Sequence, residues 1–389
     1  MKKGAANVQL MQKMNRLKVL DYVRRHPDTT RPSIAKGTGL SLPSVTNTTS
    51  YLLDRGILCE NGTEQVDRVG RKSVFLSFCA QKYDLICVFI NEKIIYIAYT
   101  DLEGKTKEKI KIDSKDLSLD EAIEKLGENV ISLSKKYGKD RILGIGVAIS
   151  GLVLEDSKFL LSAHLKWKSF DIKRTLEDLS GIPVFINNVS PIKAVWYFYH
   201  KCKETKNNML FVDLENGIGA VQFFEGKISR STLGEIGHTT VERNGEPCFC
   251  GNKGCLEAMC SLQRLFSLYE AGSAKKISSA KDIEKLYADG NNDAVYAVSE
   301  CGKYLGIGLA NLVNLFNPSE IVINTGDFKD CPSVVKEAEI ELKNRIFPSL
   351  AQNLSITKTY ETEENITYGT AFDLCNRLFD ISYEKNIVE

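Results

Sequence analysis

Four side chains with the chemistry of zinc ligands lie close together in the sequence. They have the spacing H-x9-C-x-C-x4-C and are His238, Cys248, Cys250 and Cys255. Three thiolates and one imidazole make a closed tetrahedral set for zinc and leave no position for a catalytic water. Because glycines in this stretch permit tight turns, we predict a structural zinc site in the loop 238–255. The other eight cysteines are isolated in the sequence and are expected to be unligated thiols.

The length and composition exclude several classes of protein. A chain of 389 residues, of which 43% are hydrophobic, is expected to form two or three domains. It has no run of the roughly 18–20 apolar residues that a membrane helix needs, and its basic N-terminus lacks the apolar core of a signal peptide. Eleven cysteines without a secretory signal are typical of reduced thiols. We therefore expect a cytoplasmic protein without a membrane partner.

Charge is distributed unevenly along the chain. Residues 1–78 contain 13 Lys and Arg against 6 Asp and Glu, whereas the remainder contains 38 against 44. A basic segment joined to an acidic body indicates a polyanionic partner for the first segment only.

The N-terminal segment has the pattern of short helices joined by a tight turn. Apolar residues recur at helical spacing from residue 8 to residue 25. Thr30 can cap a short helix with a proline in its first turn, and Ser41 can cap a further helix that runs to about residue 56. Glycines 37 and 39 lie between these two helices, where a tight turn is needed. This order predicts a helix-turn-helix.

The second of these two helices has polar side chains suited to reading DNA. Hydroxyl and amide groups on its outward N-terminal part could contact base edges or phosphates, and they belong to Ser44, Thr46 and Asn47. We therefore expect this helix to lie in the major groove of double-stranded DNA.

Two short strands are expected after Gly56, with a basic loop between them. This loop forms a wing, and its basic residues are Arg68, Arg71 and Lys72. Such a wing tip suits contacts with phosphates or with a narrow minor groove. We predict that residues 1–78 form a winged helix-turn-helix domain. The alternative is a small helical cap with a solvated basic loop.

Residues 79–389 alternate between strands and helices. Strands are expected near residues 86–90, 94–100, 142–150, 183–187, 211–214, 219–224 and 321–324, and long helices near 119–136, 292–314 and 333–345. An α/β body of this size is larger than one core usually spans, so we expect two lobes with a cleft between them.

Several segments of this body resemble the ROK family of repressors, open reading frames and sugar kinases. Besides the cysteine loop they are GIGVAISGLV, LSGIPVFINN, NGIGA, GEIGH, CLE and NLFNPSEIVI, in the family's order. With the winged domain, the resemblance covers nearly the whole chain and favours the sugar-responsive repressor branch, which includes xylose and N-acetylglucosamine repressors. It implies an α/β chain with an N-terminal winged helix-turn-helix and a two-lobed actin-like ATPase fold that assembles into homodimers or homotetramers.

The resemblance also implies an effector site in the cleft. Its residues here would be Gly151, Asn188, Glu235, His238 and Glu257. Such groups supply the donors and acceptors that sugar hydroxyls require. His238 would use one ring nitrogen for zinc and the other for the ligand, which couples the metal site to effector binding. The alternative for Glu257 is a carboxylate that only interacts with a helix dipole.

The chain departs from the family's kinases at four places. Residues 90–93 stand in the place of the family's first phosphate turn, D-x-G-G-T. Residues 215–217 replace the second turn, G-T-G, and introduce a carboxylate that would repel a triphosphate. Residues 324–325 replace a G-G pair. In the family's E-N-D segment the aspartate that deprotonates the sugar is replaced by Val189, which cannot take a proton. We therefore predict no catalytic residue and no enzymatic activity.

These patterns predict a DNA-binding transcriptional regulator of carbohydrate metabolism, a repressor controlled by a sugar or a sugar phosphate. Because Val189 removes a hydroxyl acceptor, the ligand could be a pentose, a phosphorylated sugar or a less polar molecule, or the pocket could be vestigial. Two alternatives stay open. One is an active sugar kinase with an added DNA-binding domain, and the other is a DNA-binding scaffold controlled by a protein partner.

Overall fold

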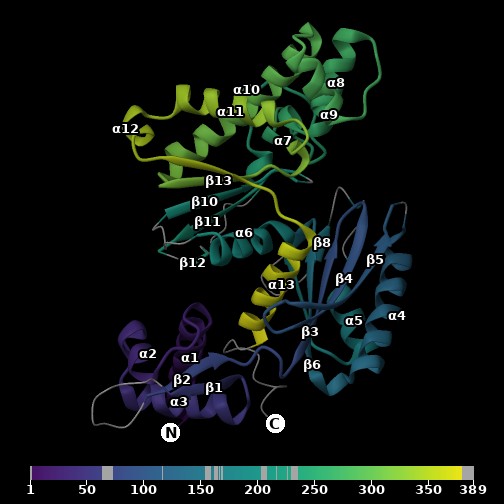
Figure 1. Ribbon diagram of the computed structural model, residues 1–389. Helices are drawn as coiled ribbons and strands as arrows, with labels where there is room; N and C mark the ends of the chain where they lie inside the picture. Colours follow the sequence, from purple (N-terminus) through teal and green to yellow (C-terminus); the bar gives the residue numbers. More distant parts are fainter. Residues whose placement is uncertain are drawn as a thin grey trace.

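The computed structural model has an N-terminal domain and two larger lobes, each built around a sheet (Figure 1). It describes residues 2–63, 73–115, 117–153, 159–161, 165, 167, 170–202, 208–215, 217–225, 227–228 and 235–378. Among the helices in these ranges, none is both long and apolar enough to cross a membrane.

The N-terminal domain is a winged helix-turn-helix. Its elements are α1 (Lys2–Arg25), α2 (Arg31–Thr38), α3 (Leu42–Asp54), β1 (Leu58–Thr63) and β2 (Val74–Phe78). Thr30 and Ser41 cap α2 and α3 as expected, and the turn between these helices contains Gly39 in the left-handed conformation. β1 and β2 pair as antiparallel strands, and the predicted helix pair is confirmed.

The first lobe contains a mixed sheet with the strand order β5-β4-β3-β6-β9. Its elements are β3 (Asp84–Ile90), β4 (Ile94–Asp101), β5 (Thr106–Asp113), α4 (Leu119–Tyr137), η1 (Lys139–Arg141), β6 (Ile142–Ile149), β7 (Leu152–Val153), β8 (Phe159–Leu161), α5 (Ile172–Ser180) and β9 (Val184–Asn188). Helices α4 and α5 share a buried apolar cluster with one face of the sheet. The strands β3, β6 and β9 are parallel, so their carboxyl ends meet at one edge.

The second lobe contains a sheet with the strand order β12-β11-β10-β13-β14. Its strands are β10 (Asn208–Asp213), β11 (Gly219–Phe224), β12 (Lys227–Ile228), β13 (Glu320–Asn324) and β14 (Ser355–Thr359). Its helices are η2 (Ile236–His238), α7 (Leu256–Cys260), α8 (Leu262–Ser273), α9 (Ala280–Ala288), α10 (Asn292–Phe316), η3 (Gly326–Phe328), α11 (Pro332–Arg345) and α12 (Pro348–Ala351). The largest buried cluster lies between one face of this sheet and helices α7 to α11.

Two further helices, α6 (Val189–His200) and α13 (Glu363–Leu378), connect the lobes and lie side by side between the two sheets (Figure 1). The apolar face of α6 packs on β10, β11 and β13 of the second lobe, whereas α13 shares a cluster with β3 and β6 of the first lobe. The helices approach closely because Gly369 has no side chain, since a Cβ atom there would lie 2.3 Å from the carbonyl oxygen of Ile192. Each sheet is therefore covered by helices on both faces, which confirms the two-lobed α/β architecture.

The N-terminal domain is packed against this helix pair. One continuous cluster of buried side chains includes Val19 and Leu76 of the N-terminal domain together with Leu85 and Leu374 of the first lobe. The expected boundary between residues 78 and 79 falls in the segment that joins β2 to β3, and it stays a prediction.

Candidate effector, metal and nucleic-acid sites

The four candidate metal ligands lie together in the folded chain. One potential ligand atom from each of His238, Cys248, Cys250 and Cys255 falls within 4.8 Å of those of the other three. The Sγ atom of Cys248 lies 3.5 Å from Nδ1 of His238, and the Sγ atoms of Cys250 and Cys255 are 3.7 Å apart. Tetrahedral zinc with ordinary bond lengths separates sulfur from nitrogen by about 3.6 Å and two sulfurs by about 3.8 Å. The donor set therefore fits zinc in both chemistry and spacing.

The loop between η2 and α7 is shaped by backbone contacts. Gly254 has a positive φ of 66°, and a Cβ atom on it would lie 1.6 Å from the carbonyl oxygen of Glu242, so only glycine fits this position. The backbone N–H of Cys248 donates to the carbonyl of Asn252 at 2.8 Å, which closes the turn that carries Cys250. Burial raises the pKa of the Cys255 thiol to about 12. A bound cation would stabilise the thiolate that burial disfavours.

Two of the predicted effector residues contact one another at the carboxyl edge of the first sheet. Asn188 ends β9 and is the N-cap of α6, where its side-chain oxygen accepts from the backbone N–H of Ser190 at 2.8 Å. Its Nδ2 atom donates to the carbonyl oxygen of Gly151 at 2.6 Å. The Asn188 side chain is thus already held in place by the segments on both sides of it.

The other predicted effector residues lie beside the metal cluster. Nδ1 of His238 faces the thiols, so Nε2 is the ring nitrogen available to a ligand. Glu257, in the first turn of α7, accepts from the backbone N–H of Ile218 at 3.1 Å through Oε2. Glu235, which precedes η2, is exposed. The contact with Ile218 connects Glu257 to the turn between β10 and β11.

The position that the ROK resemblance assigns to the kinase base is apolar. Val189 is the first residue of α6, is only 3% exposed and belongs to the same buried cluster as Ile192 and Ile366. No atom of its side chain can accept a proton.

An ion cluster occupies the place of the second phosphate turn. The ammonium of Lys193, which is 1% exposed, lies 3.1 and 3.2 Å from the carboxylate oxygens of Asp213 and 2.5 Å from Oε2 of Glu215. Asp213 also accepts from Ser190 Oγ and from Asn324 Nδ2, each at 2.7 Å. Every oxygen of the buried carboxylate therefore has a partner, as a buried charge requires.

The ion cluster changes the interpretation of Glu215. The sequence indicates a carboxylate that repels phosphate, but Lys193 is bound to it. Burial raises the pKa of Glu215, and Lys193 partly offsets this effect. Burial also tends to lower the pKa of Lys193, yet Asp213 and Glu215 outweigh it and raise the pKa. We did not predict Lys193, although a lone lysine in the apolar run of α6 was a signal for it.

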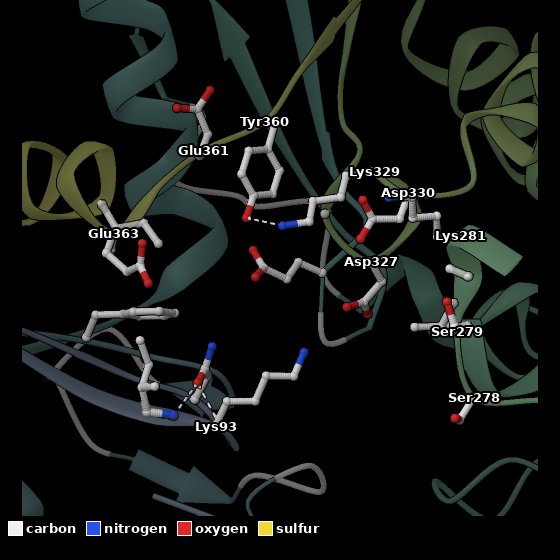
Figure 2. Close-up of a pocket in the computed structure, with 18 of the residues that line it drawn as sticks. Lys93, Ser278, Ser279, Lys281, Asp327, Lys329, Asp330, Tyr360, Glu361 and Glu363 are labelled. Carbon is white, nitrogen blue, oxygen red and sulfur yellow. Dashed lines mark hydrogen bonds between the residues drawn. The ribbon is translucent and has the colours of Figure 1, made fainter. Parts of the chain in front are cut away.

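The cleft between the lobes has a volume of about 480 Å³ and mixed charge. Figure 2 shows Lys93, Lys281 and Lys329 on its wall, together with Asp327 and Asp330. The amine of Lys329 donates to the hydroxyl of Tyr360 at 3.1 Å. Because carboxylates alternate with the amines, this wall lacks the uniformly positive field that would attract a triphosphate.

A different turn also stands in the place of the first phosphate turn of the family's kinases. The side-chain oxygen of Asn91 accepts from the backbone N–H groups of Lys93 and Ile94, each at 2.9 Å. These amides are therefore already paired within the turn that replaces D-x-G-G-T. At the place of the G-G pair, Asn324 is buried and its Oδ1 accepts from the backbone N–H of Glu361.

The candidate DNA-reading residues lie on α3. Thr46 and Asn47 are exposed and Ser44 is half-buried, whereas Val45 and Leu52 on the opposite face are in the core. The Ser44 hydroxyl contacts that of Ser41, and the Thr46 hydroxyl donates to the carbonyl of Leu42. The exposed amide of Asn47 is thus a candidate for base contacts on this face. The wing residues Arg68, Arg71 and Lys72 lie outside the described residues.

Residues 85–376 match the model of the ROK family, and the chain belongs to this family. The xylose repressor of Bacillus spizizenii is 26% identical over 359 residues, which are 90% of this chain and 92% of that protein. A crystal structure of a ROK family transcriptional regulator, a homolog of the Escherichia coli MLC protein, covers 95% of this chain and 97% of its own with a TM-score of 0.80 and 24% identity. A ROK family glucokinase from Streptomyces griseus, in complex with glucose and AMPPNP, covers 75% of this chain and 98% of its own, with a TM-score of 0.62 and 20% identity. The predicted family and architecture are thus confirmed.

Replacement of Cys250 by serine should abolish metal binding. The serine hydroxyl is a poor zinc ligand, so elemental analysis should find about one zinc per native chain and almost none in the variant. The melting temperature should fall, because metal binding at such loops is coupled to folding. The matched control is Cys59→Ser, which removes a half-buried thiol of β1. Equal zinc content in the Cys250 variant would exclude Cys250 as a ligand.

Replacement of Lys193 by methionine should leave the buried carboxylate of Asp213 and the partly buried one of Glu215 without their cation and cost about 3–5 kcal/mol of stability at neutral pH. The pKa of Glu215, already raised by burial, should rise further. A carboxyl whose folded-state pKa is raised stabilises the fold at low pH, so the deficit should shrink as pH falls from about 7 to about 4.5. Denaturant unfolding at several pH values measures this, with the exposed Lys281→Met as the control. A deficit independent of pH would contradict the ion cluster.

Proposed function

We propose that this chain is a DNA-binding transcriptional repressor of carbohydrate metabolism whose kinase-like domain binds a sugar or sugar phosphate without phosphorylating it. The observation that carries the proposal is a winged helix-turn-helix joined to a kinase fold in which Val189 fills the base position. The relationship to the xylose repressor over 90% of the chain supports the same assignment.

Residues 1–78 are the DNA-binding domain in this proposal. Ser44, Thr46 and Asn47 on α3 face the major groove, and the basic wing residues Arg68, Arg71 and Lys72 contact phosphates. A homodimer or homotetramer would place two such domains on a palindromic operator, because twofold symmetry in the protein matches twofold symmetry in the DNA. The protein acts in the cytoplasm, where the operator is.

The effector site consists of Gly151, Asn188, Glu235, His238 and Glu257. Zinc bound by His238 and the three cysteines is structural, since all four positions of the tetrahedron are protein ligands. The ion would hold the imidazole so that Nε2 is presented to a sugar hydroxyl. Because Val189 leaves one hydroxyl without an acceptor, the site suits a pentose such as xylose better than a larger sugar that needs that partner.

Phosphoryl transfer is not part of the proposed function. Family kinases such as the glucokinase share the fold of the lobes, so an active kinase is the competing assignment. Catalysis of phosphoryl transfer depends on positioning of the phosphates and on a base. Here Lys193 and Glu215 occupy one phosphate turn, Asn91 pairs the amides of the other, and Val189 replaces the base.

The first prediction from this proposal is sequence-specific DNA binding. The protein should bind a fragment of its own promoter, and the affinity should fall at least about a hundredfold between 50 and 200 mM salt, because phosphate contacts release counterions. Asn47→Ala should weaken binding by about 5- to 150-fold. Lys135→Ala, which removes an exposed charge on α4, should not. A chain lacking residues 1–78 that bound the fragment as tightly as the full chain would contradict the domain assignment.

The second prediction is sugar binding without turnover. In a thermal-shift panel, xylose or another monosaccharide should raise the melting temperature, and the Glu257→Gln variant should lose this response. With ATP, magnesium and the same sugars, formation of ADP should not exceed the background, because a proton acceptor and free phosphate turns are both missing. If the native protein phosphorylated a sugar and the Glu257→Gln variant did not, the kinase assignment would be favoured instead. If no sugar or sugar phosphate stabilised the protein, control by a protein partner would become the better assignment.

A further inference from the structure

We propose that the two adjacent arginines Arg24 and Arg25, at the end of α1, position the DNA-binding domain by attaching it to both lobes at once, so that the angle between the lobes controls DNA binding. This inference rests on the proposed function, because it assigns the regulation of the same effector site. Arg25 contacts α6 and Arg24 contacts α13, and these are the two helices that connect the lobes.

The contact with the second lobe is made by Arg25. Its Nη2 atom donates to the hydroxyl of Tyr199 at 2.7 Å, and its guanidinium lies 4.6 Å from the centre of the same ring. Tyr199 is in the last turn of α6, and α6 packs on the sheet of the second lobe through Phe198 and its neighbours. Arg25 is therefore attached to the end of α6 that packs on the second lobe.

The contact with the first lobe is made by Arg24. Its Nη1 atom donates to Oδ1 of Asn376 at 3.0 Å, and its guanidinium lies 4.3 Å from the ring centre of Phe372. Both partners are on α13, which shares its buried cluster with the sheet of the first lobe. The guanidinium groups of consecutive residues are thus bound to two different lobes.

The opposite end of α6 lies in the effector site. Asn188 caps the helix, and Ser190 and Lys193 in its first turns bind Asp213 of β10. Glu257 holds the turn after β10 through the backbone of Ile218. A ligand that draws Asn188 toward Glu257 therefore displaces the first turn of α6. This turn is connected to Asn188, which caps it, and through Asp213 to the strand that precedes the turn held by Glu257.

The helix transmits this displacement because it is short and rigid. Its 12 residues span about 18 Å, so a displacement of its first turns, which are bound to Asp213 of the second lobe, also displaces Tyr199. The close packing at Gly369 and the stacked rings of Trp196 and Tyr368, 5.2 Å apart, hold α6 against α13, so in this proposal closure of the lobes slides one helix along the other. Such shear between packed helices is a common form of lobe closure. Sliding of α6 changes the distance between Tyr199 and Phe372, whose rings are 4.1 Å apart. Because Arg25 is bound to Tyr199 and Arg24 to Phe372, α1 then has to rotate or to release one of the two arginines.

The decisive experiment measures the affinity of the full chain for its promoter fragment with and without saturating D-xylose. In the native protein, sugar should weaken DNA binding at least about fivefold. In Arg25→Ala, the ratio of the DNA affinities without and with xylose should fall below about two, while the affinity for xylose stays unchanged. Arg25→Lys, which can still donate to Tyr199, should restore part of this ratio. Lys18→Ala, which removes an exposed charge from the same helix, should keep the full ratio. A full ratio in Arg25→Ala would overturn the inference.

A second measurement separates this inference from the proposed effector. If xylose has no effect on the native protein, the sugar assignment fails, but the contact can still be tested in the absence of sugar. In a double-mutant cycle, Arg25→Ala and Tyr199→Phe should each weaken operator binding several-fold, and the double variant should be no weaker than the worse single variant. Effects that multiply independently would show that the contact does not position the DNA-binding domain.

Discussion

The buried ammonium of Lys193 is the interaction on which the arrangement of the cleft depends. It is fully enclosed, so it requires the carboxylates of Asp213 and Glu215, and these in turn fix the end of β10 and the turn after it against the first turns of α6. Removing either sign of charge would leave the other buried without a partner, which costs more than the pair itself contributes. The same cluster includes Glu215, which lies in the turn that would bind phosphate in a kinase. In the proposed repressor, this cluster would both stabilise the cleft and keep phosphate out of this turn.

A kinase-like fold that does not turn over its ligand is suited to sensing a sugar. Under the proposed function, Val189 and the altered phosphate turns would remove turnover, whereas the side chains proposed to bind hydroxyls, Asn188, His238 and Glu257, are held by contacts of their own. In this proposal a bound zinc would fix the orientation of His238, which belongs both to the candidate metal cluster and to the proposed effector site. Without turnover, occupancy depends only on ligand concentration, which is the property a regulator needs.

The position of the winged domain follows from the topology of the lobes. In this fold the chain passes between the lobes at α6 and α13, and every relative movement of the lobes must displace these two helices (Figure 1). The N-terminal domain is packed on this pair, with arginines of α1 against aromatic rings of α6 and α13. In the proposed regulator, a small closure at the effector site would thus reach the DNA-binding domain through these two helices alone.

The sequence by itself determined the features whose parts are close together in the chain. The cysteine loop, the capped helices α2 and α3 and the strands β3, β4, β6, β9, β10, β11 and β13 could be read from local spacing, because each depends on residues within about one turn, strand or loop. The strands β5, β12 and β14 were not predicted, and the missing aspartate at Val189 was inferred from the resemblance to the ROK family. The resemblance to the ROK family also predicted that Glu215 lies in the place of a phosphate turn, but it did not predict the partner of Glu215. Only the tertiary structure paired Glu215 with Lys193, 22 residues earlier, and Arg25 with Tyr199, 174 residues later. Contacts between distant segments are decided by how helices and sheets pack, and no spacing rule along the chain specifies them.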